Sequence, residues 1–177
     1  MLSRAFPYLL AAMAIVAQSA QTLQVVPLPR DGEVLVSFKL EEALTDDIRS
    51  AIQSGLTVRF VYKVELRRSS AAWFDRKIAE ATVLAQVKYD TLTRQYRYSR
   101  AVDGRTQVAD TTSSEQVAWS NLTQDFARLS LFRGASLEPN AEYYVRVTVN
   151  SSPRNSVFVW PWRADDAVGL GKFTFVR

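Results

Sequence analysis

The alternation of apolar and polar residues is clearest between Leu56 and Arg68, and we expect the rest of the chain to pack around this segment. One set of alternate positions is apolar and consists of Leu56, Val58, Phe60, Tyr62, Val64 and Leu66. The other set is mainly polar and contains the cations Arg59, Lys63 and Arg67. Because successive side chains of a strand point to opposite faces, the pattern predicts a strand with one face in a core and one in water.

Similar alternation predicts further strands on both sides of this segment. They cover Glu33–Leu40, Ile78–Asp90, Arg94–Ala101, Asn155–Trp162 and Lys172–Val176, with a short one at Leu129–Phe132. The pair Asp103-Gly104 is typical of a tight turn. Another strand is expected after Pro139-Asn140, with Tyr143 facing inward. This entry resembles the tyrosine corner of immunoglobulin-like sandwiches, and an ordinary turn followed by a strand explains it equally well.

Two short helices are expected between the strands. In the first, Thr45 is the N-cap, Asp46 and Asp47 suit the positive helix N-terminus, and Gly55 suits the left-handed position after the last turn. The second is predicted to begin at Ser113. Its apolar stripe consists of Ala118, Trp119, Leu122, Phe126 and Leu129.

About seven strands and two short helices predict a mainly β fold. The expected architecture is a two-layer antiparallel sandwich, immunoglobulin-like in general architecture, with the helices covering one end or edge. The alternative is an α+β fold in which both helices lie on one face of a single sheet.

Residues 1–19 have the pattern of a secretory signal peptide: Arg4, an apolar run over Ala5–Val16, and small residues before Ala20. Twelve helical residues rise about 18 Å, which is less than the roughly 30 Å of a bilayer's hydrocarbon core. We therefore expect export to the periplasm or the medium, with no stable membrane span after cleavage. Residues 20–32, which contain two prolines, are expected to be an extended lead-in, and residues 33–177 a single β-rich domain.

The chain of 177 residues contains no histidine and no cysteine. These absences exclude a serine–histidine triad, a cysteine nucleophile and a zinc site of the usual nitrogen or sulfur type. We find no glycine-rich phosphate loop, so neither a metal nor a cofactor is expected. The net charge of +4 is too small to predict nucleic-acid binding.

Two groups of side chains are candidates for a binding surface. The aromatic group consists of Trp73, Phe74, Phe158, Trp160 and Trp162. These rings either bind a sugar or an apolar partner, or fill part of the core. The basic group consists of Arg59, Lys63 and Arg67, which either attract an anionic partner or form an ordinary solvated strand face.

Three short stretches together resemble an exported bacterial family, the domain of unknown function 4390. They are Ile52-Gln53-Ser54-Gly55 before the central strand, Trp73-Phe74-Asp75 after it, and Tyr89-Asp90-Thr91-Leu92-Thr93-Arg94-Gln95-Tyr96. The resemblance covers roughly Leu35 to Val149 and fits less well beyond. The family has no established activity, so the resemblance implies no catalytic residue. It implies a periplasmic setting and an envelope or membrane-bound protein as partner.

Three functions are compatible with these observations. The first is a non-enzymatic exported domain that binds a protein or a cell-envelope component. The second is a carbohydrate-binding module that uses the C-terminal tryptophans. The third is a hydrolase that works through carboxylates such as Glu41-Glu42, Asp46-Asp47 or Asp165-Asp166. Adjacent residues of a strand point apart, and the Asp46-Asp47 pair already suits a helix N-terminus, so the hydrolase is the weakest of the three.

Overall fold

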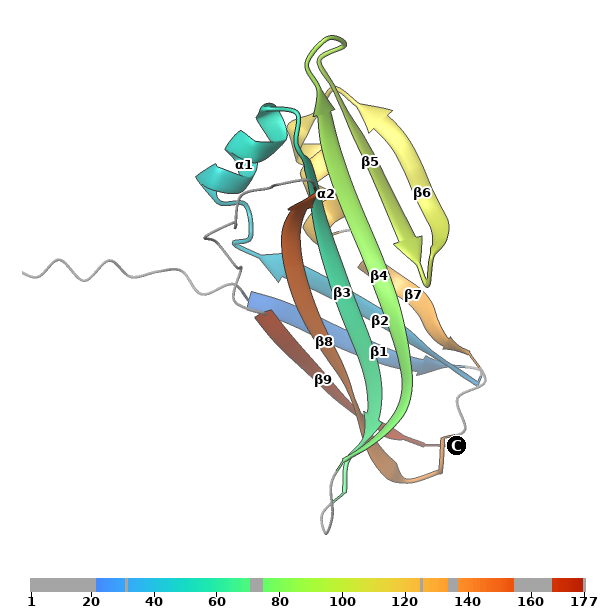
Figure 1. The fold of residues 1–177 in the computed structure, drawn as a ribbon. Coiled ribbons are helices and arrows are strands. Elements are labelled where there is room, and N and C mark those ends of the chain that lie inside the picture. Colours follow the sequence, from blue (N-terminus) through green and yellow to red (C-terminus); the bar gives the residue numbers. More distant parts are fainter. Residues whose placement is uncertain are drawn as a thin grey trace, which may run out of the picture.

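The computed structural model describes residues 22–30, 32–70, 75–124, 126–133, 137–154 and 167–176. Within them, two antiparallel sheets face each other and two helices lie at one end (Figure 1). The strands are β1 (Thr22–Arg30), β2 (Glu33–Glu41), β3 (Thr57–Arg68), β4 (Arg76–Asp90), β5 (Gln95–Val102), β6 (Arg105–Thr112), β7 (Phe126–Arg133), β8 (Ala141–Arg154) and β9 (Ala167–Phe175), and the helices are α1 (Asp46–Gln53) and α2 (Glu115–Thr123). The small sheet has the order β1-β2-β7 and the large sheet β6-β5-β4-β3-β8-β9. The predicted mainly β, two-layer architecture is confirmed.

Strand β3 lies inside the large sheet, between β4 and β8, and its two faces are as predicted from Thr57 onward. Leu56, which was predicted to face inward, precedes the strand and is 37% exposed. Val58, Phe60, Tyr62, Val64 and Leu66 are each at most 4% exposed. The register places Tyr62 opposite Val83 of β4 and Val149 of β8, so the buried rows of the three strands coincide. This shared apolar row forms the inner face of the large sheet.

Aromatic rings join the two sheets across the core. Phe38 of β2 stacks on Phe126 of β7 with ring centroids 4.4 Å apart. Both rings contact Tyr62 of β3, at 5.0 Å and 4.8 Å between centroids. The Tyr62 hydroxyl donates a hydrogen bond of 2.6 Å to the carbonyl of Leu122, and burial raises the pKa of this hydroxyl. The buried phenol is therefore satisfied by a polar partner.

Both helices pack against the same inner face of the large sheet, beyond the small sheet. Helix α1 contacts β3 and β4, and helix α2 contacts β4 and β5. The predicted cap of α1 is confirmed, because the Thr45 side chain accepts a hydrogen bond from the Ile48 amide and Gly55 has a φ of 84°. The small sheet and the helices all cover one side of the large sheet, and no described helix or strand covers its other side (Figure 1).

The second helix is shorter than its apolar stripe predicted. Its N-cap is Ser114, one residue later than expected, and it ends at Thr123. Phe126 and Leu129 belong instead to β7, which pairs with β2. The stacking of Phe126 on Phe38 accounts for this difference, because tertiary packing outweighs helical periodicity.

The segment predicted as an extended lead-in is a paired strand of the domain. Strand β1 pairs with β2 along its whole length and occupies an edge of the small sheet. Pro27 and Pro29 are compatible with that position, since an edge strand leaves some of its amides without a ladder partner. Strand β1 also packs against β9 of the large sheet, where Gly169 and Gly171 allow close approach.

Strand β8 begins at the turn after Pro139-Asn140, for which a tyrosine corner and an ordinary turn were equally compatible with the sequence. The Tyr143 hydroxyl accepts a hydrogen bond of 2.8 Å from the amide of Glu138, five residues upstream. A hydrogen bond from the hydroxyl back to the preceding backbone is the defining feature of a tyrosine corner. The structure therefore supports that interpretation over an ordinary turn.

The predicted signal peptide of residues 1–19 and the predicted strand Asn155–Trp162 lie outside the described residues. In the part of the chain that is described, neither helix has the length and apolar character needed to cross a membrane.

Candidate functional site

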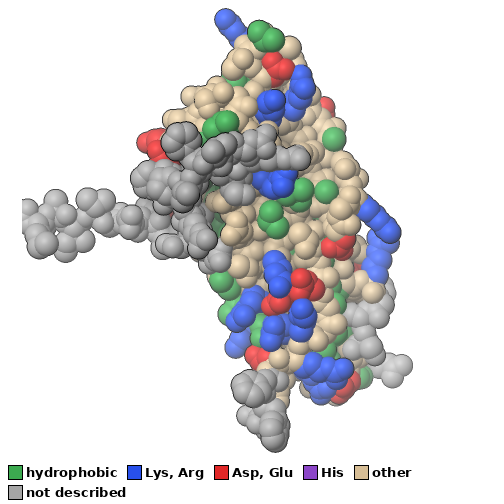
Figure 2. Space-filling model, viewed as in Figure 1, with side chains coloured by type: hydrophobic (Ala, Val, Ile, Leu, Met, Phe, Trp, Pro, Cys, Tyr) green, Lys and Arg blue, Asp and Glu red, His purple; other side chains and the backbone are tan. Residues whose placement is uncertain are grey.

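The open side of the large sheet, which we call the outer face, carries the side chains that alternate with the buried rows. All three predicted basic residues lie on it, because Arg59, Lys63 and Arg67 alternate with the buried residues of β3. Figure 2 shows lysine and arginine side chains spread over this face, with carboxylates among them in its lower half. The solvent-facing orientation predicted for the basic group is correct.

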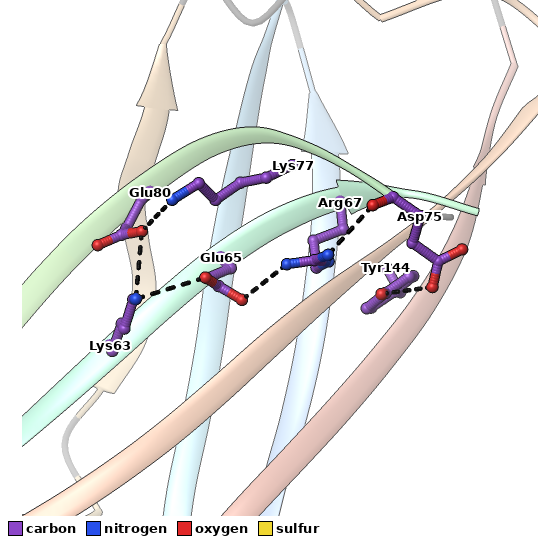
Figure 3. A network of polar contacts seen from close by, with 7 residues as sticks. All are labelled: Lys63, Glu65, Arg67, Asp75, Lys77, Glu80 and Tyr144. Atoms are coloured by element: carbon purple, nitrogen blue, oxygen red, sulfur yellow. Dashed lines mark hydrogen bonds and ion pairs between the residues drawn. The ribbon is translucent and has the colours of Figure 1, made fainter. Parts of the chain in front are cut away.

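The lower half of the outer face is a charge network of seven residues (Figure 3). They are Lys63, Glu65, Arg67, Asp75, Lys77, Glu80 and Tyr144. The Lys63 Nζ lies 3.5 Å from carboxylate oxygens of both Glu65 and Glu80. The Lys77 Nζ lies 2.7 Å from Glu80, and Arg67 Nη1 lies 3.2 Å from Glu65. Lys63 and Arg67, two of the three predicted cations, are therefore paired with carboxylates. This half of the outer face is a solvated sheet surface with little net charge.

Asp75 is the last residue before β4, and its side chain links the β3–β4 connection to β8. Its Oδ2 accepts a hydrogen bond of 2.7 Å from the Tyr144 hydroxyl, and its Oδ1 accepts one of 3.2 Å from the Ser70 amide. The hydrogen bond from Tyr144, followed by that from Ser70, holds the pKa of the Asp75 carboxyl below its usual value. These contacts join the two ends of the β3–β4 connection to each other and to β8.

Replacing Tyr144 by phenylalanine is expected to raise the pKa of Asp75 toward the ordinary aspartate value of about 3.9, because the largest cause of its lowering is removed. In the unchanged protein, the contribution of this contact to stability is present above about pH 4 and is lost as the pH falls through the lowered pKa. A carboxyl-carbon NMR titration measures the change. Asp90 is the internal control, because backbone amides of Thr93 and Leu92 lower its pKa. A similar shift at both aspartates would contradict this assignment.

The upper half of the outer face contains an open depression of about 560 Å³, which we call the polar groove. It is lined by Thr57, Gln86, Val87, Lys88, Arg97, Tyr98, Ser99, Ala109, Asp110 and Thr111. Val87 and Tyr98 oppose each other on the inner side of the sheet, so the side chains directed outward are mainly hydroxyl, amide and cationic groups. The volume is within the range of small-ligand sites.

Two cations, Lys88 and Arg97, line this groove, and a third, Arg59, lies beside it. The register places Lys88 of β4 directly opposite Arg97 of β5, and places Arg59 of β3 opposite Gln86, two residues from Lys88. Arg97 forms an ion pair of 2.7 Å with Asp90. Among the described residues, Lys88 and Arg59 have no carboxylate partner, and the Nε of Arg59 is buried without a hydrogen bond. Lys88 therefore brings to the polar groove a positive charge that no described carboxylate pairs with, whereas the cations of the charge network are paired.

The aromatic candidates cannot be placed in this arrangement. Trp73, Phe74, Phe158, Trp160 and Trp162 all lie outside the described residues. Their assignment as a binding surface or as core stays a prediction, and so does the carbohydrate-binding module that depends on them.

Among the described carboxylates considered for hydrolysis, none lines the polar groove. Asp46 and Asp47 lie in the first turn of α1, and Glu41 pairs with Lys39 at the end of β2. The polar groove contains one acidic residue, Asp110. Within the described ranges, no group of three or more acidic side chains is placed to hold a metal ion. Asp165-Asp166 lies outside the described residues.

Sequence reasoning missed the residues that distinguish the two halves of the outer face. Lys88 and Arg97 were assigned to predicted strands, but their opposition depends on the register of β4 with β5. The Asp90–Arg94 turn between those strands was a signal for a hairpin. Counting outward from this turn would have paired Lys88 with Arg97.

Comparison with known proteins gives one match. The model of a family described as a domain of unknown function (DUF4390) matches residues 17–154. No curated protein and no solved structure matches the chain. The matched residues include every strand of the large sheet except β9, and all the residues that line the polar groove.

Proposed function

The chain belongs to the DUF4390 family, and we propose that it is an exported, non-enzymatic domain that binds a protein or another component of the cell envelope. The binding surface that we assign is the outer face of the large sheet. Export is inferred from the pattern of residues 1–19, where a short cationic start precedes an apolar run and small residues.

The observation that carries this proposal is the one-sided covering of the large sheet. The small sheet and both helices pack on its inner face, and no described helix or strand packs on its outer face, which is therefore the side that we assign to a partner (Figures 1 and 2). A sheet with one solvated face is common among antiparallel proteins, and by itself would be unremarkable. Here the outer face also contains the polar groove, where Lys88 has no carboxylate partner among the described residues, and this gives a partner a place to bind.

Binding without turnover is favoured by the residue types on this face. The sequence contains no histidine or cysteine to act as a proton shuttle or nucleophile near neutral pH. The carboxylates of the charge network are held in ion pairs and hydrogen bonds, as Glu80 is by Lys77. Recognition requires only a complementary surface, which these side chains can supply.

Site-specific crosslinking in cells that naturally make the protein tests this proposal. A photoreactive residue replaces Thr82, which is exposed on the outer face between the charge network and the polar groove. The matched control replaces Lys39, which is exposed on the small sheet. We expect a discrete crosslinked product from position 82 and none from position 39. Equal crosslinking from both positions, or none from position 82, would refute the outer face as the binding surface.

Export itself is tested by the mass of the mature protein. We expect the envelope fraction to contain a chain that begins at Ala20, because the small residues before it match a signal-peptidase site. Intact mass spectrometry of fractionated cells measures the N-terminus. Recovery of the full 177-residue chain in the cytoplasm would contradict the proposed export.

A further inference from the structure

We infer that the polar groove is a binding site for an acidic saccharide, with Lys88 and Arg97 contacting its anionic group. This inference rests on the proposed function and deepens it, because it names the chemical class of an envelope component. The site lies across β3, β4, β5 and β6, away from the charge network.

The arrangement of charge indicates an anionic ligand. Lys88 and Arg97 lie directly opposite each other on neighbouring antiparallel strands, and like charges in that position repel. Asp90 pairs with Arg97 at 2.7 Å, and the one acidic lining residue, Asp110, stands opposite Tyr98 in the register. Lys88 has no carboxylate partner among the described residues. Arg59 adds a third cation beyond Gln86 on the neighbouring strand. An anion between Lys88 and Arg97 would replace this repulsion by two charge-assisted hydrogen bonds.

The neutral side chains of the groove indicate a hydroxyl-rich ligand. Gln86 donates a hydrogen bond of 2.9 Å to the hydroxyl of Ser99, which fixes both side chains at the centre of the groove. Thr57 and Thr111 line its two sides. Amide and hydroxyl groups of this kind both donate and accept hydrogen bonds, as sugar hydroxyls do.

The groove offers little to an apolar ligand. Its apolar lining residues are Val87, which is 1% exposed, the half-buried Tyr98, and Ala109 with its single methyl group. In the described strands of the large sheet, the most exposed large aliphatic side chains are Val168 and Leu170 of β9, at its other edge. An acyl chain or an apolar peptide side chain would therefore find no large exposed aliphatic side chain to pack against here. A charged, hydroxylated ligand matches the lining better than a lipid or a hydrophobic peptide.

Titration of the isotope-labelled protein with trigalacturonate tests this inference, using NMR chemical shifts. We expect the largest changes at the amides of Gln86, Lys88, Arg97 and Ser99. Replacing Lys88 by glutamine is expected to weaken the Kd about tenfold, the effect of losing one charge-assisted hydrogen bond. The matched control is Lys63→Gln, which removes the same charge from the same face outside the groove. It should change the Kd less than about twofold, because exposed charges at that distance are screened.

Two further probes separate the chemical classes. Maltotriose, a neutral trisaccharide, and inorganic phosphate should both bind at least tenfold more weakly than trigalacturonate, since each offers only one of the two features. Equal binding of maltotriose would overturn the requirement for an anion, and equal binding of phosphate would overturn the requirement for a saccharide. Shifts centred on the charge network, or an equal loss in the two lysine variants, would overturn the site.

Failure of this inference is distinguishable from failure of the proposed function. If trigalacturonate does not bind while position 82 still forms a discrete crosslink, the acidic saccharide is wrong and the binding role of the outer face stands. If neither result is obtained, both are wrong.

Discussion

Replacing Phe60 by alanine is expected to lower the free energy of unfolding by about 3 to 5 kcal/mol, the usual cost of emptying a packed aromatic site. Phe60 is 0% exposed on the inner face of the large sheet. Its ring lies edge-on to Trp119 of α2 with centroids 6.1 Å apart, so its loss also weakens the contact between the sheet and this helix. Equilibrium unfolding in urea, followed by tryptophan fluorescence and circular dichroism, measures the change.

The matched control is Arg59→Ala, one residue earlier on the outer face. It should alter the free energy of unfolding by less than about 0.5 kcal/mol, because the side chain contributes no packing between the sheets. Similar losses for the two variants would mean that the inner and outer faces of β3 have been assigned wrongly.

Replacing Gly169 by alanine is expected to destabilise the protein by about 1 to 3 kcal/mol through overpacking. A Cβ at this position would lie 2.4 Å from the Leu23 carbonyl oxygen and 2.6 Å from Val25 Cγ2. The first of these atoms belongs to the backbone, so β1 and β9 must move apart to accommodate the methyl group. Thermal and urea unfolding measure the loss.

Val168→Ala is the control for this variant, since Val168 precedes Gly169 on the same strand and is 52% exposed. It should change the free energy of unfolding by less than about 0.5 kcal/mol. If Gly169→Ala were as stable as this control, the close packing of β1 on β9 would be refuted.

The spacing of apolar residues was sufficient to predict the helices and strands that bury only one face. Strand β3 and helix α1 were predicted nearly to the residue, because each has apolar positions at a regular spacing and α1 has a cap at each end. Strand β6 was missed because Arg105–Thr112 is polar on both faces, as expected of an edge strand that contributes little to the core. Strand β1 was missed because Pro27 and Pro29 indicate a loop unless the strand is known to be at an edge.

Predicting the site required information that alternation alone does not contain. Alternation placed Arg59, Lys63 and Arg67 on one face correctly. It could not show that Glu65 and Glu80 neutralise Lys63 while Lys88 remains unpaired among the described residues. That difference depends on which residues of β4 oppose those of β3 and β5, and register is determined by the turns and by the packing of the whole sheet. The groove follows from the same register.

The central claim, that the outer face contacts a partner, is tested most directly by lysine footprinting. Lysines are acylated in the native envelope and in the purified protein, and each site is quantified by mass spectrometry. Lys63 and Lys39 are well matched, with side chains 51% and 46% exposed on the large and small sheets. We predict that labelling of Lys63, Lys88 and Lys172 falls in the envelope while that of Lys39 is unchanged. Protection of Lys39 alone, or no protection at any of these lysines, would contradict the claim.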